Sequence, residues 1–397
     1  MVGGMRDLRI DVARGLALVA IFINHVPSAA TSITWRHYGF SDASDLFVFL
    51  AGYGAAIAWS DHFQRNPVEG MWQAATRALH LYKVHLCMVL ALAGIAVAGG
   101  WLGDRPDLPS WIGLAFLTGA PVEGWWRVMV LTYLPNFADI LPLYIVFIGS
   151  LGLLGPALVR WPAAALALSL TIWWLAGRQG WAPTGSPDGG TWFLNPLTWQ
   201  VLFVTGFLLG RRARLGLSLP RHPLLTAAAV AYLLYAILCI APWHRFGLFP
   251  DVAGLDPAWV VPHGKHEQEI GRLLHFAAIA YLGAVLVAPR APWLAGAVGR
   301  SLALLGRNSL PVYVTGVLLC VPMTYLIFLT PTTWTTELVL TLSGVPVLFA
   351  IALAADQDKA DRRAGAVATP KASPAPATIH APGPALSAMD MRGGPAT

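Results

Sequence analysis

Charged residues are scarce in this chain, and their scarcity decides its class. Only 12% of the 397 residues are Asp, Glu, Lys or Arg, while 56% are hydrophobic. A soluble domain usually carries about a quarter charged residues. The composition therefore excludes a water-soluble globular enzyme.

Cysteine is scarce too, and the common ligand-binding motifs are missing. The three cysteines fall in apolar stretches at unrelated spacings, which excludes a disulfide framework and a CxxC metal site. The run His263-Gly264-Lys265-His266-Glu267 places two histidines in a polar loop with a lysine between them, a pattern more typical of solvated side chains than of metal ligands. We predict no metal site. The net charge of +6 is not gathered into a basic run, so no nucleic-acid partner is expected.

Long apolar runs are abundant, and they recur at the spacing of bilayer crossings. A helix of about 20 apolar residues spans the hydrocarbon core. We predict an all-α, polytopic membrane protein of about ten transmembrane helices, with the lipid bilayer as its surroundings. The predicted spans are residues 12–32, 43–59, 78–102, 138–158, 163–177, 197–210, 223–241, 273–288, 302–328 and 337–355.

The distribution of basic residues predicts the orientation. An N-in, C-in arrangement sends most of the 26 Lys and Arg residues to the cytoplasmic side, as the positive-inside rule requires. The last residues are rich in Pro, Ala and Gly and bury too little apolar surface to offset chain entropy. We therefore expect a transmembrane domain over residues 1–356 and a disordered cytoplasmic tail over residues 357–397.

The first predicted span carries two ionisable residues, Arg14 and His25. They are eleven positions apart, so they project from one helix face about 16 Å apart along the axis. An ionisable residue inside a membrane is a candidate for function. The plainer alternatives are a histidine bonded to a neighbouring helix and an arginine that anchors the topology.

The Arg14 to His25 spacing resembles the first-helix motif of the membrane acyltransferase-3 superfamily. Further segments resemble one branch of it, the OpgC family, which decorates periplasmic glucans with succinyl groups. These segments are Arg6–Asp11, Arg14–Ala17, Gly39–Ala43, Phe47–Gly52, Asp139–Tyr144, Phe193–Gln200, Arg272–Phe276 and Leu305–Tyr313.

The resemblance implies an acyl transfer in the bacterial inner membrane. The expected donor is cytoplasmic acyl-CoA, with succinyl-CoA favoured as the co-substrate, and no tightly bound cofactor is expected. The expected acceptor is a hydroxyl of osmoregulated periplasmic glucan on the far side of the membrane.

Such a transfer needs a general base for the sugar hydroxyl, and His25 suits that role because imidazole titrates near neutral pH. Asp45 and Asp139 are the candidate carboxylate partners of His25, and His275 is a candidate to stand opposite it. For both aspartates the alternative is a charge at a helix start, and for His275 it is a buried core histidine. Asp42, just before the second span, is read as an N-cap.

The donor and the acceptor need their own sites. Arg14 and the run Arg307-Asn308-Ser309 are candidates for the phosphates or the thioester of acyl-CoA. Amides beside an indole form a reasonable sugar platform. The acceptor candidates are therefore Asn195, Trp199, Gln200 and Arg272.

Two other classes of protein compete with this hypothesis. A proton-coupled secondary transporter of a small polar solute also has ionisable residues near the midplane, but an inverted repeat is lacking. A non-enzymatic membrane scaffold has no use for Arg14 and His25 inside the membrane.

Overall fold

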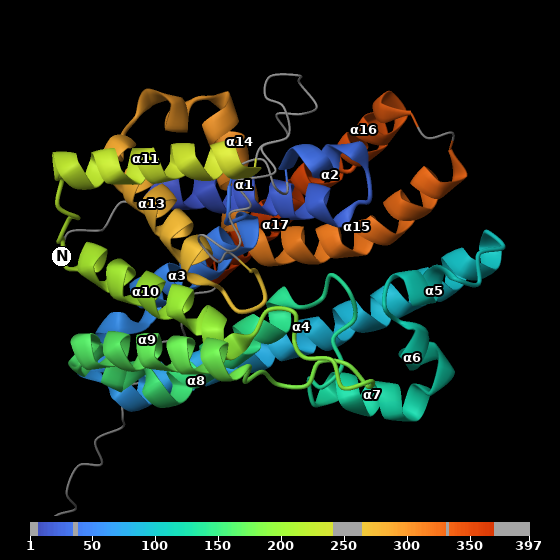
Figure 1. The fold of residues 1–397 in the computed structure, drawn as a ribbon, viewed down its shortest axis with the longest axis horizontal. Coiled ribbons are helices and arrows are strands. Elements are labelled where there is room, and N and C mark those ends of the chain that lie inside the picture. The colour runs from blue at the N-terminus through green and yellow to red at the C-terminus, as the bar shows by residue number, and fades with distance from the viewer. Residues whose placement is uncertain (1–6, 35–38, 241–263, 331–332, 369–397) are drawn as a thin grey trace, which may run out of the picture. The chain divides into compact units, whose positions relative to one another are not determined.

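The computed structural model describes residues 7–34, 39–240, 264–330 and 333–368 (Figure 1). In these ranges the regular elements are helices, and one isolated bridge joins Thr184 to Thr191. The predicted all-α fold is confirmed for this part of the chain. The helices are α1 (Leu8–His25), α2 (Ala29–Thr34), α3 (Ala43–Arg65), α4 (Pro67–Leu102), α5 (Leu108–Trp111), α6 (Ala115–Gly119), α7 (Pro121–Met129), α8 (Ile140–Arg160), α9 (Pro162–Gln179), α10 (Pro196–Arg214), α11 (Pro223–Ile240), α13 (Ile270–Leu286), η2 (Pro292–Ala295), α14 (Ala297–Arg307), α15 (Ser309–Leu329), α16 (Trp334–Ser343) and α17 (Val345–Ala368).

Several of these helices have the length and the apolar composition needed to cross a membrane. Within the described residues, six stretches meet both criteria: α3, α4, α8, α11, α15 and the run Trp334–Ala364. The chain is therefore a multi-pass membrane protein. The predicted count of ten spans and the N-in, C-in orientation stay predictions.

Three predicted spans are broken rather than continuous. Within the predicted span 12–32, the first helix ends at His25, because Pro27 lacks the N–H that would continue the helix. The range 302–328 is divided at Asn308, which caps α14 before α15 begins. The range 337–355 is divided at Gly344, just before Pro346 in the first turn of α17. Apolar content alone did not reveal these breaks.

The predicted disordered tail is wrong for its first part. The chain divides into two units, Met1–Asp356 and Gln357–Thr397, but α17 continues to Ala368. Residues 357–368 are rich in Ala, Asp, Lys and Arg, and Asp358 and Arg362 form an ion pair one turn apart, which stabilises a helix. Residues 369–397 lie outside the described residues.

Helix α3 lies at the centre of the first unit, where it packs against α1, α4, α8 and α10 (Figure 1). Its closest approach is to α10, and glycines permit it. A Cβ on Gly52 would lie 2.0 Å from the carbonyl oxygen of Phe203, and one on Gly206 would lie 2.1 Å from that of Phe49. Small residues that let backbones meet are the usual device for packing helices in a membrane.

Helices α1 and α14 cross in the same way. A Cβ on Gly15 would lie 2.0 Å from the carbonyl oxygen of Leu302, and one on Gly306 would lie 1.9 Å from that of Asp11. Each helix thus contributes one glycine to the crossing. The contact fixes the half of α1 that carries Arg14.

We expect Gly206→Ala to destabilise the protein strongly, because its Cβ overlaps a backbone carbonyl that cannot move without shifting α3. Overpacking a core lowers the free energy of unfolding by about 1–3 kcal/mol, and we expect a clash with a backbone atom to lie at the upper end of that range. Thermal unfolding of the purified protein in detergent measures the effect. Gly94→Ala in α4 is the matched control, since its Cβ meets nothing within 4 Å. Equal melting temperatures for both variants would contradict this packing.

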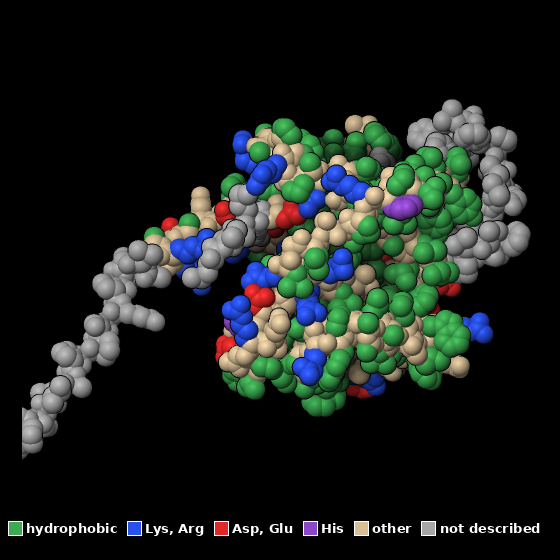
Figure 2. Space-filling model, turned by 90° about the vertical axis from the view of Figure 1, so that its left-hand side faces the viewer, with side chains coloured by type: hydrophobic (Ala, Val, Ile, Leu, Met, Phe, Trp, Pro, Cys, Tyr) green, Lys and Arg blue, Asp and Glu red, His purple; other side chains and the backbone are tan. Residues whose placement is uncertain are grey.

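Several Lys and Arg side chains are spread over the face of the molecule that Figure 2 shows. Helix α10 ends there, with Arg211, Arg212 and Arg214 in its last turn. Basic residues at helix ends are typical of the cytoplasmic face of a membrane protein.

Candidate active site

A cavity of about 700 Å³ lies at the helix ends opposite the glycine crossing of α1. The last turn of α1, the first turn of α3 and the residue before α8 form part of its wall. Loops that precede α6, α8, α10 and α13 complete it. Its polar and ionisable lining residues are Asn24, His25, Ser44, Tyr133, Asn136, Asp139, Ser186, Asp188, Thr191, Trp192 and Lys265.

His25 is the last residue of α1 and lines this cavity. Its ring packs against Phe137, with the ring centroids 4.9 Å apart. The buried Nδ1 has no hydrogen-bond partner among the residues that the structure describes. His25 is therefore held by packing at the cavity wall, and the structure does not bring a carboxylate to hydrogen-bond distance of Nδ1.

The two candidate carboxylates lie in different surroundings. Asp139 stands immediately before α8, makes no side-chain cap hydrogen bond there, and lines the same cavity as His25. Asp45, in the first turn of α3, is fully buried and bonds to Arg272 and Gln268 instead. Of the two, Asp139 is the one placed in the cavity with His25.

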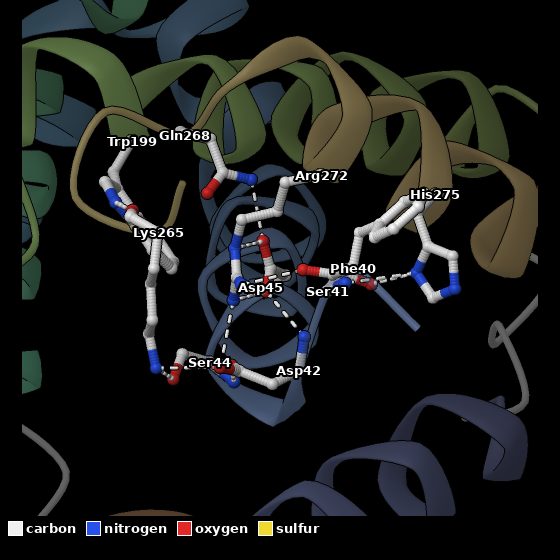
Figure 3. Close-up of polar contacts among 10 residues, drawn as sticks. All are labelled: Phe40, Ser41, Asp42, Ser44, Asp45, Trp199, Lys265, Gln268, Arg272 and His275. Carbon is white, nitrogen blue, oxygen red and sulfur yellow. Dashed lines mark hydrogen bonds and ion pairs between the residues drawn. The ribbon is translucent and has the colours of Figure 1, made fainter. Parts of the chain in front are cut away.

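Arg272 joins α13 to the start of α3 (Figure 3). Its guanidinium bonds both carboxylate oxygens of Asp45, with Nε 3.1 Å from Oδ1, and lies 3.0 Å from Oδ2 of Asp42. Nη1 donates to the carbonyl oxygen of Phe40 at 2.9 Å, and Gln268 donates to Asp45 at 2.7 Å. The pair of Arg272 and Asp45 is almost wholly buried, so it is a structural bond at the core of this end of the protein.

Asp42 connects this buried pair to the cavity. Its Oδ2 accepts a hydrogen bond from the Lys265 ammonium at 2.8 Å, and its Oδ1 caps α3 at the N–H of Ser44. Burial alone would raise the pKa of the Asp42 carboxyl, but the Lys265 ammonium and the Arg272 guanidinium outweigh burial and hold that pKa well below its usual range. The N-cap prediction for Asp42 is confirmed, and the ion pairs are an addition to it.

His275 is fully buried, and the structure places it beside the loop before α3 rather than at the cavity wall. The backbone N–H of Ser41 donates to Nδ1 at 3.2 Å, and the Ser41 hydroxyl lies 2.7 Å from the same atom. Gly39, at φ +112°, leaves room for the ring, because a Cβ there would lie 2.2 Å from Nε2. His275 thus holds the loop that carries Asp42.

The predicted acceptor residues of α10 are bonded within the protein. Asn195 caps α10 and donates to Glu267 at 3.0 Å, while the Trp199 indole donates to the carbonyl oxygen of Lys265 at 3.0 Å. Gln200 bonds Ser169 of α9. Among the described residues that line the cavity, none of these three occurs. Asn195 and Trp199 instead fix the segment Gly264–Glu269.

The predicted donor residues lie at the other end of the helices. The Arg14 side chain donates to the carbonyl oxygen of Leu50 at 3.0 Å. Asn308 donates to Asp356 at 3.3 Å, and Arg307 lies 3.8 Å from the same carboxylate. Ser309 begins α15. The structure thus groups Arg307, Asn308 and Asp356 and leaves Arg14 on the separate contact of α1 with α3.

Three residues that the structure places at the cavity could not be singled out from their sequence pattern: Ser44, Phe137 and Lys265. The polar pattern around Lys265 indicates a solvated loop residue, and Phe137 lies just before the predicted span 138–158. The residue His263 lies outside the described residues, while His266 bonds Glu267 and Thr191. In the described ranges no group of three or more His, Cys, Asp or Glu side chains is placed to hold a metal ion.

The fold and the cavity define a multi-pass helical membrane protein with a polar site at its helix ends. A family model described as OpgC protein matches residues 6–360, and the chain belongs to the OpgC family. No curated protein and no solved structure matches the chain. The resemblance inferred from the sequence is thereby confirmed, and the family indicates a transferase involved in glucan modification.

Proposed function

We propose that this protein is an inner-membrane O-acyltransferase. It transfers a succinyl or other small acyl group from cytoplasmic acyl-CoA to hydroxyls of osmoregulated periplasmic glucan. The observation that carries the proposal is the position of His25, which lines a polar cavity at the end of α1, the helix that carries Arg14 in its first half.

In this reaction the His25 imidazole removes the proton of a glucan hydroxyl as its oxygen attacks the thioester carbonyl. A tetrahedral adduct forms, its C–S bond breaks, and the CoA thiolate takes up the proton that His25 holds. The products are a glucan ester and free CoA. Of the two candidate partners, Asp139 lines the same cavity and is the carboxylate proposed to favour the imidazolium form of His25.

The donor enters from the side of Arg14 in this proposal. A guanidinium binds a phosphate through two parallel hydrogen bonds, whereas an ammonium acts as a point charge. About 16 Å of helix separates Arg14 from His25, and the extended pantetheine arm of acyl-CoA lies along that distance. Arg307 and Asn308 form a second candidate contact for the donor at the same end.

Sidedness provides the direct test. In sealed, oriented vesicles, labelled succinyl-CoA supplied to the cytoplasmic face alone should label glucan on the opposite face. Uptake of label without an ester bond would identify a transporter instead. Labelling that requires succinyl-CoA on the glucan side would contradict transfer across the membrane.

We expect Arg14→Lys to raise the apparent KM for acyl-CoA about tenfold, since a tenfold loss of affinity corresponds to about 1.4 kcal/mol and the bidentate contact is lost. The KM for glucan should change less than twofold. Initial-rate kinetics with each substrate varied in turn measures both values. Arg212→Lys, at an exposed position of α10, is the matched control. An unchanged KM for acyl-CoA would mean that Arg14 does not bind the donor and serves as a topology anchor.

A further inference from the structure

Lys265 is a cation held at the wall of the cavity that contains His25. Three groups fix its ammonium: Asp42 Oδ2 at 2.8 Å, the Ser44 hydroxyl at 3.2 Å and the Phe193 ring, whose centroid is 5.6 Å away. The Trp199 indole fixes its backbone through the carbonyl oxygen. A long and flexible side chain is thus confined to one position.

Lys265, Asp42, Asp45 and Arg272 form one ion-pair network, and only one of its charged side chains reaches the cavity. Asp42, Asp45 and Arg272 are buried, with side chains 5%, 0% and 6% exposed, and none of them is among the residues that line the cavity. Lys265 is 22% exposed and lines it. Among the charged members of the network, Lys265 is therefore the one that a bound substrate meets.

The ammonium also has donor capacity to spare. It carries three N–H donors, and two of them are directed at Asp42 and Ser44. The structure places no third hydrogen-bond acceptor on it within the described part of the chain. The remaining N–H is available to an oxygen atom in the cavity.

We propose that Lys265 stabilises the oxyanion that forms on the acyl carbonyl during transfer. This inference rests on the proposed function. As the sugar oxygen adds to the carbonyl carbon, the C=O electron pair moves to the carbonyl oxygen, and the Lys265 N–H donates a hydrogen bond to that anion. When the C–S bond breaks, the electron pair returns and the thiolate takes the proton from His25. Lys265 keeps its own proton throughout.

Fixed donors aimed at a developing charge are the most effective form of such stabilisation, because they need no reorganisation during the reaction. Asp42 and Ser44 supply the fixation here, so both are positioning residues. They touch Lys265, and they act on the reaction through it.

The experiment compares Lys265→Met with wild type in the vesicle assay, with kcat and KM determined separately. Removing one oxyanion donor costs about 10²–10³ in kcat. We expect that loss, with both KM values within threefold of wild type, because the methionine keeps the length of the side chain. Lys83→Met, at an exposed site on α4, is the matched control and should leave both parameters unchanged.

A chemical rescue separates charge from folding. Lys265→Cys in a Cys87→Ser, Cys239→Ser background should be as slow as Lys265→Met. Alkylation with 2-bromoethylamine restores an ammonium at the length of lysine. It should raise kcat at least tenfold above that of the unmodified cysteine variant. Alkylation with iodoacetamide adds similar bulk without charge and should recover nothing.

Two results would overturn the inference. One is a kcat for Lys265→Met within threefold of wild type. The other is a raised KM for succinyl-CoA with an unchanged kcat and an unchanged KM for acetyl-CoA. That result would mean that Lys265 binds the free carboxylate of the succinyl group. If wild type itself transfers no acyl group, the proposed function fails, and that outcome is distinct from either of these.

Discussion

Replacing His25 by alanine should lower kcat for glucan acylation by about 10²–10⁴, the range for loss of a general base. The protein should still fold and insert. The ring packs on Phe137 at the edge of a cavity and its Nδ1 has no hydrogen-bond partner in the described part of the chain, so its removal leaves no polar group newly unpaired. The same vesicle assay measures the rate, and thermal unfolding in detergent measures the fold.

The matched control is His62→Ala, an exposed histidine near the other end of α3. It should match wild type in both measurements. If His25→Ala retains activity within twofold of wild type, His25 has no part in the chemistry and the cavity must act through another base.

Replacing Arg272 by methionine should prevent stable folding or lower the melting temperature severely. Breaking a buried ion pair by removing one partner costs about 3–5 kcal/mol, because the remaining charge is left buried. Asp45 would lose both of its guanidinium contacts, and Asp42 would keep Lys265 as its charged partner. Thermal unfolding and size-exclusion behaviour in detergent measure this loss.

The exposed pair of Arg214 and Asp61 offers a matched comparison. Its side chains are 43% and 41% exposed, and surface pairs contribute about 0–1 kcal/mol. Arg214→Met should therefore melt close to wild type. A double variant, Arg272→Met with Asp45→Leu, should recover part of the stability, since removal of both partners leaves no unpaired charge at Asp45. A stable Arg272→Met protein would show that this network does not hold the fold.

The positions of many helices could be predicted because the signal is local. A run of apolar residues of bilayer length is visible without knowledge of any neighbour, and within the described residues the predicted ranges fall on helices, of which six stretches are long and apolar enough to cross a membrane. The breaks at Pro27, Asn308 and Gly344 are local too, but their effect depends on packing. Similar residues within α8 and α15, Pro156 and Pro322, do not end those helices.

The site could be predicted only in part. His25 was found because its cost inside a membrane is a property of the residue itself. The bond between Asp45 and Arg272 joins residues 227 positions apart, and the one between Asp42 and Lys265 joins residues 223 apart. Neither pairing leaves a trace in a single sequence. Both were settled by the packing of α13 and its preceding segment against the start of α3.

The same reason explains why the sugar platform proposed for Asn195, Trp199 and Gln200 has no counterpart at the cavity. Amide and indole groups look alike in sequence whether they bind a ligand or cap a helix. Here their hydrogen bonds hold the segment Gly264–Glu269 and the neighbouring helix α9.

The reciprocal glycines of α1 and α14 have a mechanical consequence. Gly15 and Gly306 each place a helix backbone against a carbonyl oxygen of the other helix, so neither sliding by one residue nor rotation is possible without collision. We therefore expect α1 and α14 to move together as one rigid unit. Any opening that admits a substrate or releases a product is then expected to come from the elements that face this pair of helices.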